Sequence, residues 1–166
     1  MKYRKIFGMY MNLEKKDLEL LKELQKDSSQ SLKKLSRKLK IPITTIYDKK
    51  KKFEKEGIIK NYRAILDPDM LGKTVLSFIF LKVRYDADNN KSISLKDIAR
   101  EVSLIPGVMA VHIVTGEWDL LIKMRSKDMK EVGDILTDHI IKIKGISGSL
   151  TLNTWITIKD TCELDI

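Results

Sequence analysis

The alternation of two hydrophobic periodicities in the second half of the sequence constrains the fold more than any other feature. Two segments repeat apolar residues with the helical period, one carrying Leu95, Ile98, Ala99 and Val102, the other Met129, Val132, Ile135, Leu136 and Ile140. Four segments have the apolar composition of strands, at 76–85, 108–114, 119–125 and 150–158. The resulting order, β-α-β-β-α-β, predicts a ferredoxin-like fold with both helices on one face of a four-stranded sheet.

That arrangement leaves the other face of the sheet uncovered. We expect Phe78, Phe80, Val111 and Trp155 to lie there, and their apolar surface is too large to remain in water. A second copy of so small a domain is the expected cover. The sequence therefore predicts a homodimer that forms through this sheet.

The first 66 residues have the pattern of three short helices. An apolar stripe begins at Leu13 and ends near the turn-type residues 27–29. Ser31 is a candidate N-cap for the second helix, and the small Ser36 within it would let a neighbouring helix approach. Residues 40–42 form a tight turn before the third helix, which stops at a glycine. This spacing predicts a helix-turn-helix motif at about 32–56.

These patterns predict an α+β protein with an N-terminal winged helix-turn-helix domain and a C-terminal ferredoxin-like domain. The β-rich run 58–66 would supply the wing or a connecting strand, residues 86–90 a polar turn, and Ser94 the cap of the next helix. The predicted organisation comprises a flexible extension (1–11), the helix-turn-helix domain (12–66), a linker (67–73), the ferredoxin-like domain (74–160) and a tail (161–166).

Charge is distributed unevenly between the two halves. Residues 1–66 contain 19 Lys and Arg against 8 Asp and Glu, a net charge of +11, whereas residues 67–166 contain 13 against 15, a net charge of −2. A basic first part indicates a polyanionic partner for that part alone. Because it lacks an amphipathic helix with aromatic anchors, nucleic acid fits better than a membrane surface.

Several classes of protein do not fit the composition. No apolar stretch is long enough to span a bilayer, and the N-terminus lacks the features of a secretory signal, so the cytoplasm is the expected location. Cys162 is the single cysteine, and His112 and His139 lack partners at metal-ligand spacing. We expect no metal, no cofactor and no enzymatic activity.

Four consecutive lysines, Lys49 to Lys52, interrupt the third helix. Lys50 falls on the same stripe as the apolar Ile46 and Phe53, seven residues apart. One interpretation is a solvated face in which Lys50 lays its stem over the core. The other is a surface that binds phosphate.

Several motifs together resemble the Lrp/AsnC (leucine-responsive, or feast/famine) family of transcription regulators, over roughly residues 12–160. The resemblance rests on LEKKDLELLKELQKDSSQS at 13–31, on LKKLSRKLKIPITTIYDKKKKFEKEGIIKNYRAILDPDMLG at 32–72, on TGEWD at 115–119 and on GISGSLT before the last strand. The sequence departs from the family at Pro42, where a serine is usual, and at Lys49 and Lys50, where an arginine and an apolar residue are usual.

The resemblance implies a sequence-specific regulator of double-stranded DNA whose dimers assemble into tetramers or octamers and which senses an amino acid. The residues that it places near base edges are Thr44, Thr45, Tyr47 and Asp48. Those that it places near phosphates are Lys49, Lys51, Lys52 and Arg37. Tyr47 could equally pack between helices, and Arg37 could belong to a solvated face.

The resemblance also implies that the hairpin Thr115, Gly116, Glu117, Trp118 and Asp119 binds the effector, with Asp119 on the ammonium group of an amino acid. The alternative is a plain turn in which Gly116 supplies a positive φ. Two other functions compete: an amino-acid-sensing module that does not bind DNA, and a tetrapyrrole decarboxylase of the same architecture. The basic first part argues against the former, and the scarcity of histidine and arginine near the hairpin against the latter.

Overall fold

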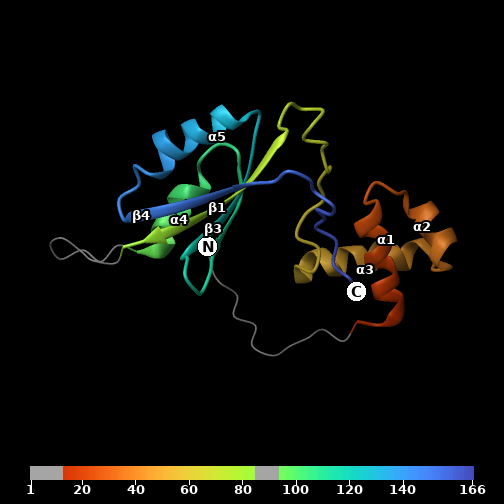
Figure 1. Ribbon diagram of the computed structural model, residues 1–166. Helices are drawn as coiled ribbons and strands as arrows, with labels where there is room; N and C mark the ends of the chain where they lie inside the picture. The colour runs from red at the N-terminus through yellow and green to blue at the C-terminus, as the bar shows by residue number, and fades with distance from the viewer. Residues whose placement is uncertain (1–12, 85–93) are drawn as a thin grey trace. The chain divides into compact units, whose positions relative to one another are not determined.

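The computed structural model describes residues 13–84 and 94–166 and divides the chain into two compact units (Figure 1). The first unit comprises the residues up to Ala64 together with Asp160–Ile166, and the second comprises Ile65–Lys159. The segment predicted as a tail thus belongs with the helical unit. The predicted extension 1–11, the polar turn 86–90 and residue 85 of the first predicted strand lie outside the described residues.

Three helices form the first unit, as predicted: α1 (Lys15–Lys26), α2 (Leu32–Leu39) and α3 (Ile43–Glu56). Ser31 caps α2, because its side chain accepts a hydrogen bond from the backbone amide of Lys34. One core cluster holds the helices together and consists of the buried residues Leu20, Leu21, Leu24, Leu35, Ile41, Ile46 and Phe53.

A tight turn joins α2 to α3. Lys40 adopts the left-handed conformation with φ of 54°, and the hydroxyl of Ser36 donates to the carbonyl of Ile41 at 2.7 Å. Ser36 therefore closes this turn, which is a different role from the predicted close approach of a helix. Gly57 ends α3 with φ of 76°, as expected of a helix-ending glycine.

The run 58–66 forms neither a wing strand nor a connecting strand. Ile58 and Ile59 turn back and pack against the helical core, and both of their amides donate to the carbonyl of Phe53. Residues 60–66 have no regular secondary structure. The apolar residues that suggested a strand serve the helical core instead.

The second unit is the predicted ferredoxin-like fold. Its antiparallel sheet has the order β2-β3-β1-β4, formed by β1 (Val75–Val83), β2 (Val108–Ile113), β3 (Leu120–Ser126) and β4 (Ile146–Asn153). The helices are α4 (Leu95–Ser103) and α5 (Met129–Ile135), which continues as the π-helical turn η1 (Leu136–Ile140). Ser94 is the N-cap residue of α4, although its side chain makes no capping hydrogen bond.

Helices cover one face of the sheet and leave the other face open. Ile79 and Leu81 on β1 are fully buried in a core that also contains Ile98 and Val102 of α4 and Ile140 of η1. The alternate residues of β1, Phe78 and Phe80, are only partly buried and lie on the opposite face. Opposite them in register are Leu152 and Leu150 on β4, which are 50% and 42% exposed. These four residues (Phe78, Phe80, Leu150 and Leu152), called the open face below, are apolar, and Lys123 of β3 lies beside them as the other register partner of Phe78.

Two residues predicted for the open face lie elsewhere. Val111 pairs with the buried Ile122 and packs against the helix-side core, because a bulge between Val108 and Ala110 shifts the phase of β2. The last strand runs from 146 to 153 instead of from 150 to 158, since the glycine-containing run pairs with β1. Trp155 therefore follows the strand and is 95% exposed.

No helix within residues 13–84 and 94–166 is long and apolar enough to cross a membrane.

Candidate nucleic-acid interface and effector hairpin

The third helix presents most of its surface to solvent. Its N-cap is Pro42, which supplies a fixed φ of −55° but no side-chain cap. Only Ile46 and Phe53 are buried, and they lie on one side of the helix. The remaining faces of α3 are therefore available to a partner, except where its lysines contact the rest of the unit.

Lys49 is one such exception. Its ammonium nitrogen lies 2.5 Å from Oδ1 of Asp17 on α1 and 3.7 Å from Oε2 of Glu14. Both members of the closer pair are shielded, with 21% of the Lys49 side chain and 9% of the Asp17 side chain exposed. The structure thus places Lys49 against α1, away from the solvent-facing stripe of α3.

The titration of Asp17 reflects this contact. Burial alone would raise the pKa of its carboxyl group, but the hydrogen bonds from Lys49 and from the amide of Glu14 outweigh burial and lower it. The same hydrogen bond raises the pKa of Lys49. The pair is therefore charged throughout the neutral range.

The exposed stripe of α3 contains the other predicted contact residues. Thr44, Asp48, Lys51 and Lys52 are exposed, and Thr45 is half-buried. Tyr47 is 46% exposed, so it does not pack between helices as the alternative would require. Each of these residues is three or four positions from another of the set, so together they lie on one side of the helix.

Lys51 and Tyr47 form a cation–π contact on that stripe, with the ammonium nitrogen 4.6 Å from the ring centroid. The contact with Tyr47 raises the pKa of Lys51 above its ordinary value, so the lysine stays charged. The tyrosine ring and the ammonium group are thereby held side by side on the surface of the helix.

Lys50 lies in a different environment from the neighbouring lysines. It is half-buried, and its ammonium nitrogen lies 4.9 Å from the ring centroid of Tyr62. Burial and a 2.9 Å hydrogen bond to Glu54 raise the pKa of Tyr62 to about 12. This geometry favours the interpretation in which Lys50 lays its stem along the domain.

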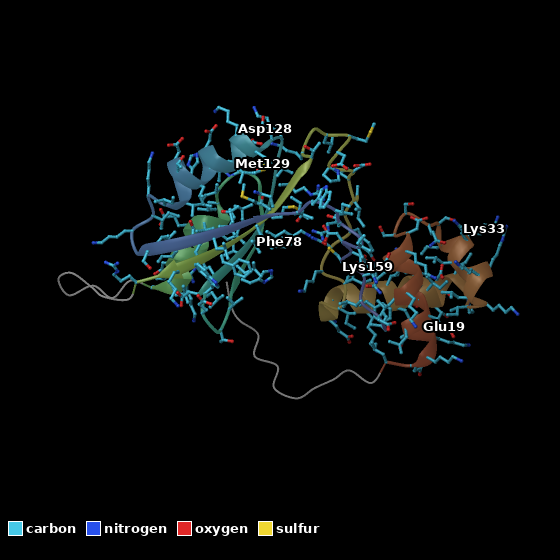
Figure 2. The ribbon with its side chains drawn as sticks, in the orientation of Figure 1. Glu19, Lys33, Phe78, Asp128, Met129 and Lys159 are labelled. Atoms are coloured by element: carbon cyan, nitrogen blue, oxygen red, sulfur yellow. The ribbon has the colours of Figure 1, made fainter. Side chains whose placement is uncertain are left out.

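The second helix contributes a basic surface that includes the predicted phosphate contact Arg37. An open hollow on α2 is lined by Ser31, Lys33, Lys34, Arg37 and Lys38, and Figure 2 labels Lys33 there. Arg37 is exposed, as are Lys33 and Lys34. Lys38 is 2.5 Å from Glu23 of α1 and is thus partly neutralised. The four basic residues among the eight of this short helix were the available signal for Lys33 and Lys34.

The predicted effector hairpin connects β2 to β3. Gly116 has φ of 126°, as the turn interpretation requires, and Thr115 and Glu117 are exposed. Trp118 is half-buried beside Phe80 of the open face, with 6.2 Å between ring centroids. The hairpin is therefore continuous with the apolar face of the sheet.

Asp119 makes specific contacts at the base of the hairpin. Its Oδ2 accepts a hydrogen bond of 2.8 Å from the amide of Val83 and lies 3.9 Å from the ammonium nitrogen of Lys82. The side chain is only 15% exposed. The ammonium group of Lys82 also donates to the carbonyl of Glu117. Asp119 therefore connects the hairpin to the end of β1.

Two family models match the chain, one to each unit. A winged helix-turn-helix DNA-binding model matches residues 13–60, and the Lrp/AsnC ligand binding domain model matches residues 79–164. The matched regions contain the helices α1 to α3 and most of the sheet, respectively.

Curated relatives match along nearly their whole length. An uncharacterized HTH-type transcriptional regulator of Pyrococcus furiosus is 36% identical over 148 residues, which cover 89% of this chain and 96% of that protein. The HTH-type transcriptional regulator FL11 of Pyrococcus horikoshii is 32% identical, with coverage of 95% and 99%.

Solved structures share the fold. A transcriptional regulator of Neisseria meningitidis, crystallised with L-methionine, has a TM-score of 0.84 at 25% identity, covering 92% of this chain and 96% of that one. AsnC of E. coli has a TM-score of 0.78 at 21% identity, with coverage of 91% and 97%.

Proposed function

This chain belongs to the Lrp/AsnC family of HTH-type transcription regulators, and on that basis we propose which of its residues read DNA, which surface makes the dimer and where an effector binds. The chain is a DNA-binding transcription regulator that carries a small-molecule-binding domain.

The exposed stripe of α3 enters the major groove. Thr44, Thr45, Tyr47 and Asp48 occupy the N-terminal half of the helix, which is the half that reaches base edges in helix-turn-helix proteins. The observation that carries this assignment is that these residues are exposed or half-exposed, while Ile46 and Phe53 on the opposite side are buried.

Phosphate contacts come from the C-terminal part of that stripe and from α2. Lys51 and Lys52 lie on the stripe, and Arg37 on α2 lies in a surface with Lys33 and Lys34. Point charges of this kind fix the position of a protein on the duplex without reading its sequence. Lys49 takes no direct part, because its ammonium group is bound to Asp17; it positions α3 instead.

A salt titration tests the DNA-binding assignment. The protein is titrated against its own upstream DNA and against a random duplex of equal length, at low and at physiological salt. Each phosphate contact should contribute about −0.9 to the slope of log K against log salt. Lys51→Ala and Lys52→Ala should each flatten the slope, and Lys96→Ala, an exposed lysine of the other unit, is the matched control. A slope that is flat in the wild type contradicts the assignment.

A homodimer forms through the open face of the sheet. Phe78, Phe80, Leu150 and Leu152 form an apolar surface there, bordered by Lys123 of β3, and Figure 2 labels Phe78 on β1. Burying apolar area stabilises by about 25 cal/mol per Å², so this surface favours association with a second copy. Dimers then assemble into tetramers or octamers.

An amino acid is the proposed effector, bound at the Thr115–Asp119 hairpin. The related regulator of Neisseria meningitidis was crystallised with L-methionine, and this chain matches the same ligand-binding domain model. Asp119 supplies a carboxylate for an ammonium group at a position that is fixed by its bond to Val83. Titration with a panel of amino acids, followed by light scattering, tests this proposal.

The relatives that match this chain are transcription regulators, which favours regulation over the tetrapyrrole decarboxylase alternative.

A further inference from the structure

The last turn of α1 binds the C-terminal end of the chain. The side-chain amide of Gln25 donates to the carbonyl of Leu164 at 3.0 Å, and its Oε1 accepts from the amide of Leu164 at 2.8 Å. One carboxamide thus satisfies both backbone groups of a single residue, as a neighbouring strand would. This pairing is independent of the Leu164 side chain, which is 71% exposed.

Two further contacts hold the same segment. The guanidinium group of Arg63 donates to Sγ of Cys162 at 3.2 Å. Ile166 is half-buried and packs against the core cluster of the three helices. The contacts fall on residues 162, 164 and 166, so every second residue of the segment touches the helical unit.

The segment and the rest of the helical unit are far apart in sequence. Between Ala64 and Asp160 the chain builds the entire second unit. It then returns, and only residues 154–159 separate the end of β4 from the docked segment. The helix that receives the segment, α1, is also the helix that holds α3 through Asp17 and Lys49.

We propose that the surface of α1 around Gln25 is a docking site for the C-terminal segment Asp160–Ile166 of the same chain, and that DNA binding at full affinity requires this docking. The second half of the proposal rests on the proposed DNA-binding function. The helix-turn-helix unit thus includes residues 160–166, and the chain connects this unit to β4 through residues 154–159, in addition to the connection that follows α3.

Cross-linking tests the docking by itself. Arg63→Cys introduces a second thiol next to Cys162, and a short bismaleimide should join the two within one chain, as detected by mass spectrometry after proteolysis. Adding Gln25→Ala should lower the yield of this product. A cross-link between two chains would overturn the assignment to the same chain, and the absence of any cross-link would overturn the docking.

Measurements of DNA affinity test the second half of the proposal, that full affinity requires the docked segment. A chain that ends at Lys159, and the full chain with Gln25→Ala, should bind the upstream DNA about fivefold or more weakly, since two neutral hydrogen bonds and a packed side chain are lost. Leu164→Ala is the matched control, because it keeps the backbone bonds and should bind as the wild type does. Hydrogen exchange of the α1 amides shows whether each variant is folded.

The outcomes separate the two proposals. If the chain that ends at Lys159 and the Gln25→Ala variant are both folded and bind DNA as the wild type does, the segment has no part in DNA binding. If the wild type binds no DNA, the proposed function fails, while the cross-linking result on docking stands.

Discussion

The ammonium nitrogen of Lys49 on α3 lies 2.5 Å from Oδ1 of Asp17 on α1. The contact joins the helix that is proposed to read DNA to the helix that receives the C-terminal segment. Of the four consecutive lysines, Lys49 is thus bound within the domain and Lys50 lies over Tyr62, which leaves Lys51 and Lys52 on the exposed stripe.

Lys49→Ala and Lys52→Ala should therefore affect different properties: the first the stability of the helical unit, the second the binding of DNA. Removing Lys49 leaves the buried carboxylate of Asp17 without its partner, so the free energy of unfolding should fall by about 1–3 kcal/mol in denaturant titrations. Lys52→Ala should change it by less than about 0.5 kcal/mol, since the side chain is exposed, but should reduce the salt slope of DNA binding by about 1. Equal stability of the two variants would contradict the anchoring role of Lys49.

The stability of the helical unit should depend on pH through Asp17. Because the pKa of Asp17 is lower in the folded state, its contribution is complete above the unfolded value of about 3.9 and disappears as the pH falls through the folded value. The difference in unfolding free energy between the wild type and Asp17→Asn should thus be constant near neutrality and shrink below about pH 4. Urea titrations from pH 2 to 7 measure it, and a difference that is independent of pH would contradict the ion pair.

Thr45→Ala and Lys51→Ala should weaken DNA binding in different ways. Loss of a base-edge contact relaxes sequence preference by about 1–3 kcal/mol, whereas loss of a phosphate contact weakens all sequences alike. Binding to the upstream DNA and to a random duplex should therefore change unequally for Thr45→Ala and equally for Lys51→Ala. Equal changes for both variants would remove Thr45 from the residues that read the sequence.

Much of the architecture follows from local patterns. The helical stripes of the first 56 residues and the strand–helix order of the second unit have strong periodicities, and both predictions are confirmed. The prediction of the last strand at 150–158 is wrong, because the glycine-containing run before it pairs with β1 and the strand ends at Asn153. Strand pairing depends on residues that are distant in the sequence, and the hydrophobic periodicity of one segment does not determine it.

The site was harder to predict than the fold. Thr44, Asp48 and Lys52, which the sequence predicts as DNA contacts, are exposed. The sequence gives the same predicted role to Lys49, which is instead bound to α1. Its partner Asp17 is 32 residues earlier, so the ion pair depends on how α1 packs against α3. The docking of the C-terminal segment was not predicted for the same reason. Residues 161–166 alternate polar and apolar side chains, but their partners lie more than 90 residues away in the sequence.

Leu152→Lys should dissociate the proposed dimer. Leu152 is opposite Phe78 on the open face, and an ammonium group there would have to be buried in the dimer without a partner. Sedimentation should give the mass of a single chain for this variant and of two chains for the wild type. Ile158→Lys is the matched control, because Ile158 is 92% exposed and follows β4, and it should remain dimeric. A dimeric Leu152→Lys chain would place the interface on another surface.

Asp119 requires a substitution that separates charge from structure. Its Oδ2 accepts the amide hydrogen of Val83, so Asp119→Ala would remove an effector contact and a fold contact together. Asp119→Asn keeps an oxygen that can accept this hydrogen bond while removing the negative charge that would pair with an ammonium group. The dimer and the binding of DNA without effector should therefore be preserved in Asp119→Asn.

The same variant should no longer respond to an amino acid. An effector shifts an assembly only by its differential affinity for the two states, and the neutral amide loses the charge on which that affinity depends. Light scattering of the wild type with a panel that includes L-methionine should show a change in assembly, and Asp119→Asn should show none. Glu101→Gln removes a charge from an exposed position of α4, outside the hairpin, and should respond as the wild type does. If Asp119→Asn responds fully, the hairpin is a turn and the effector binds elsewhere; if the wild type responds to no amino acid, the proposed class of effector is wrong.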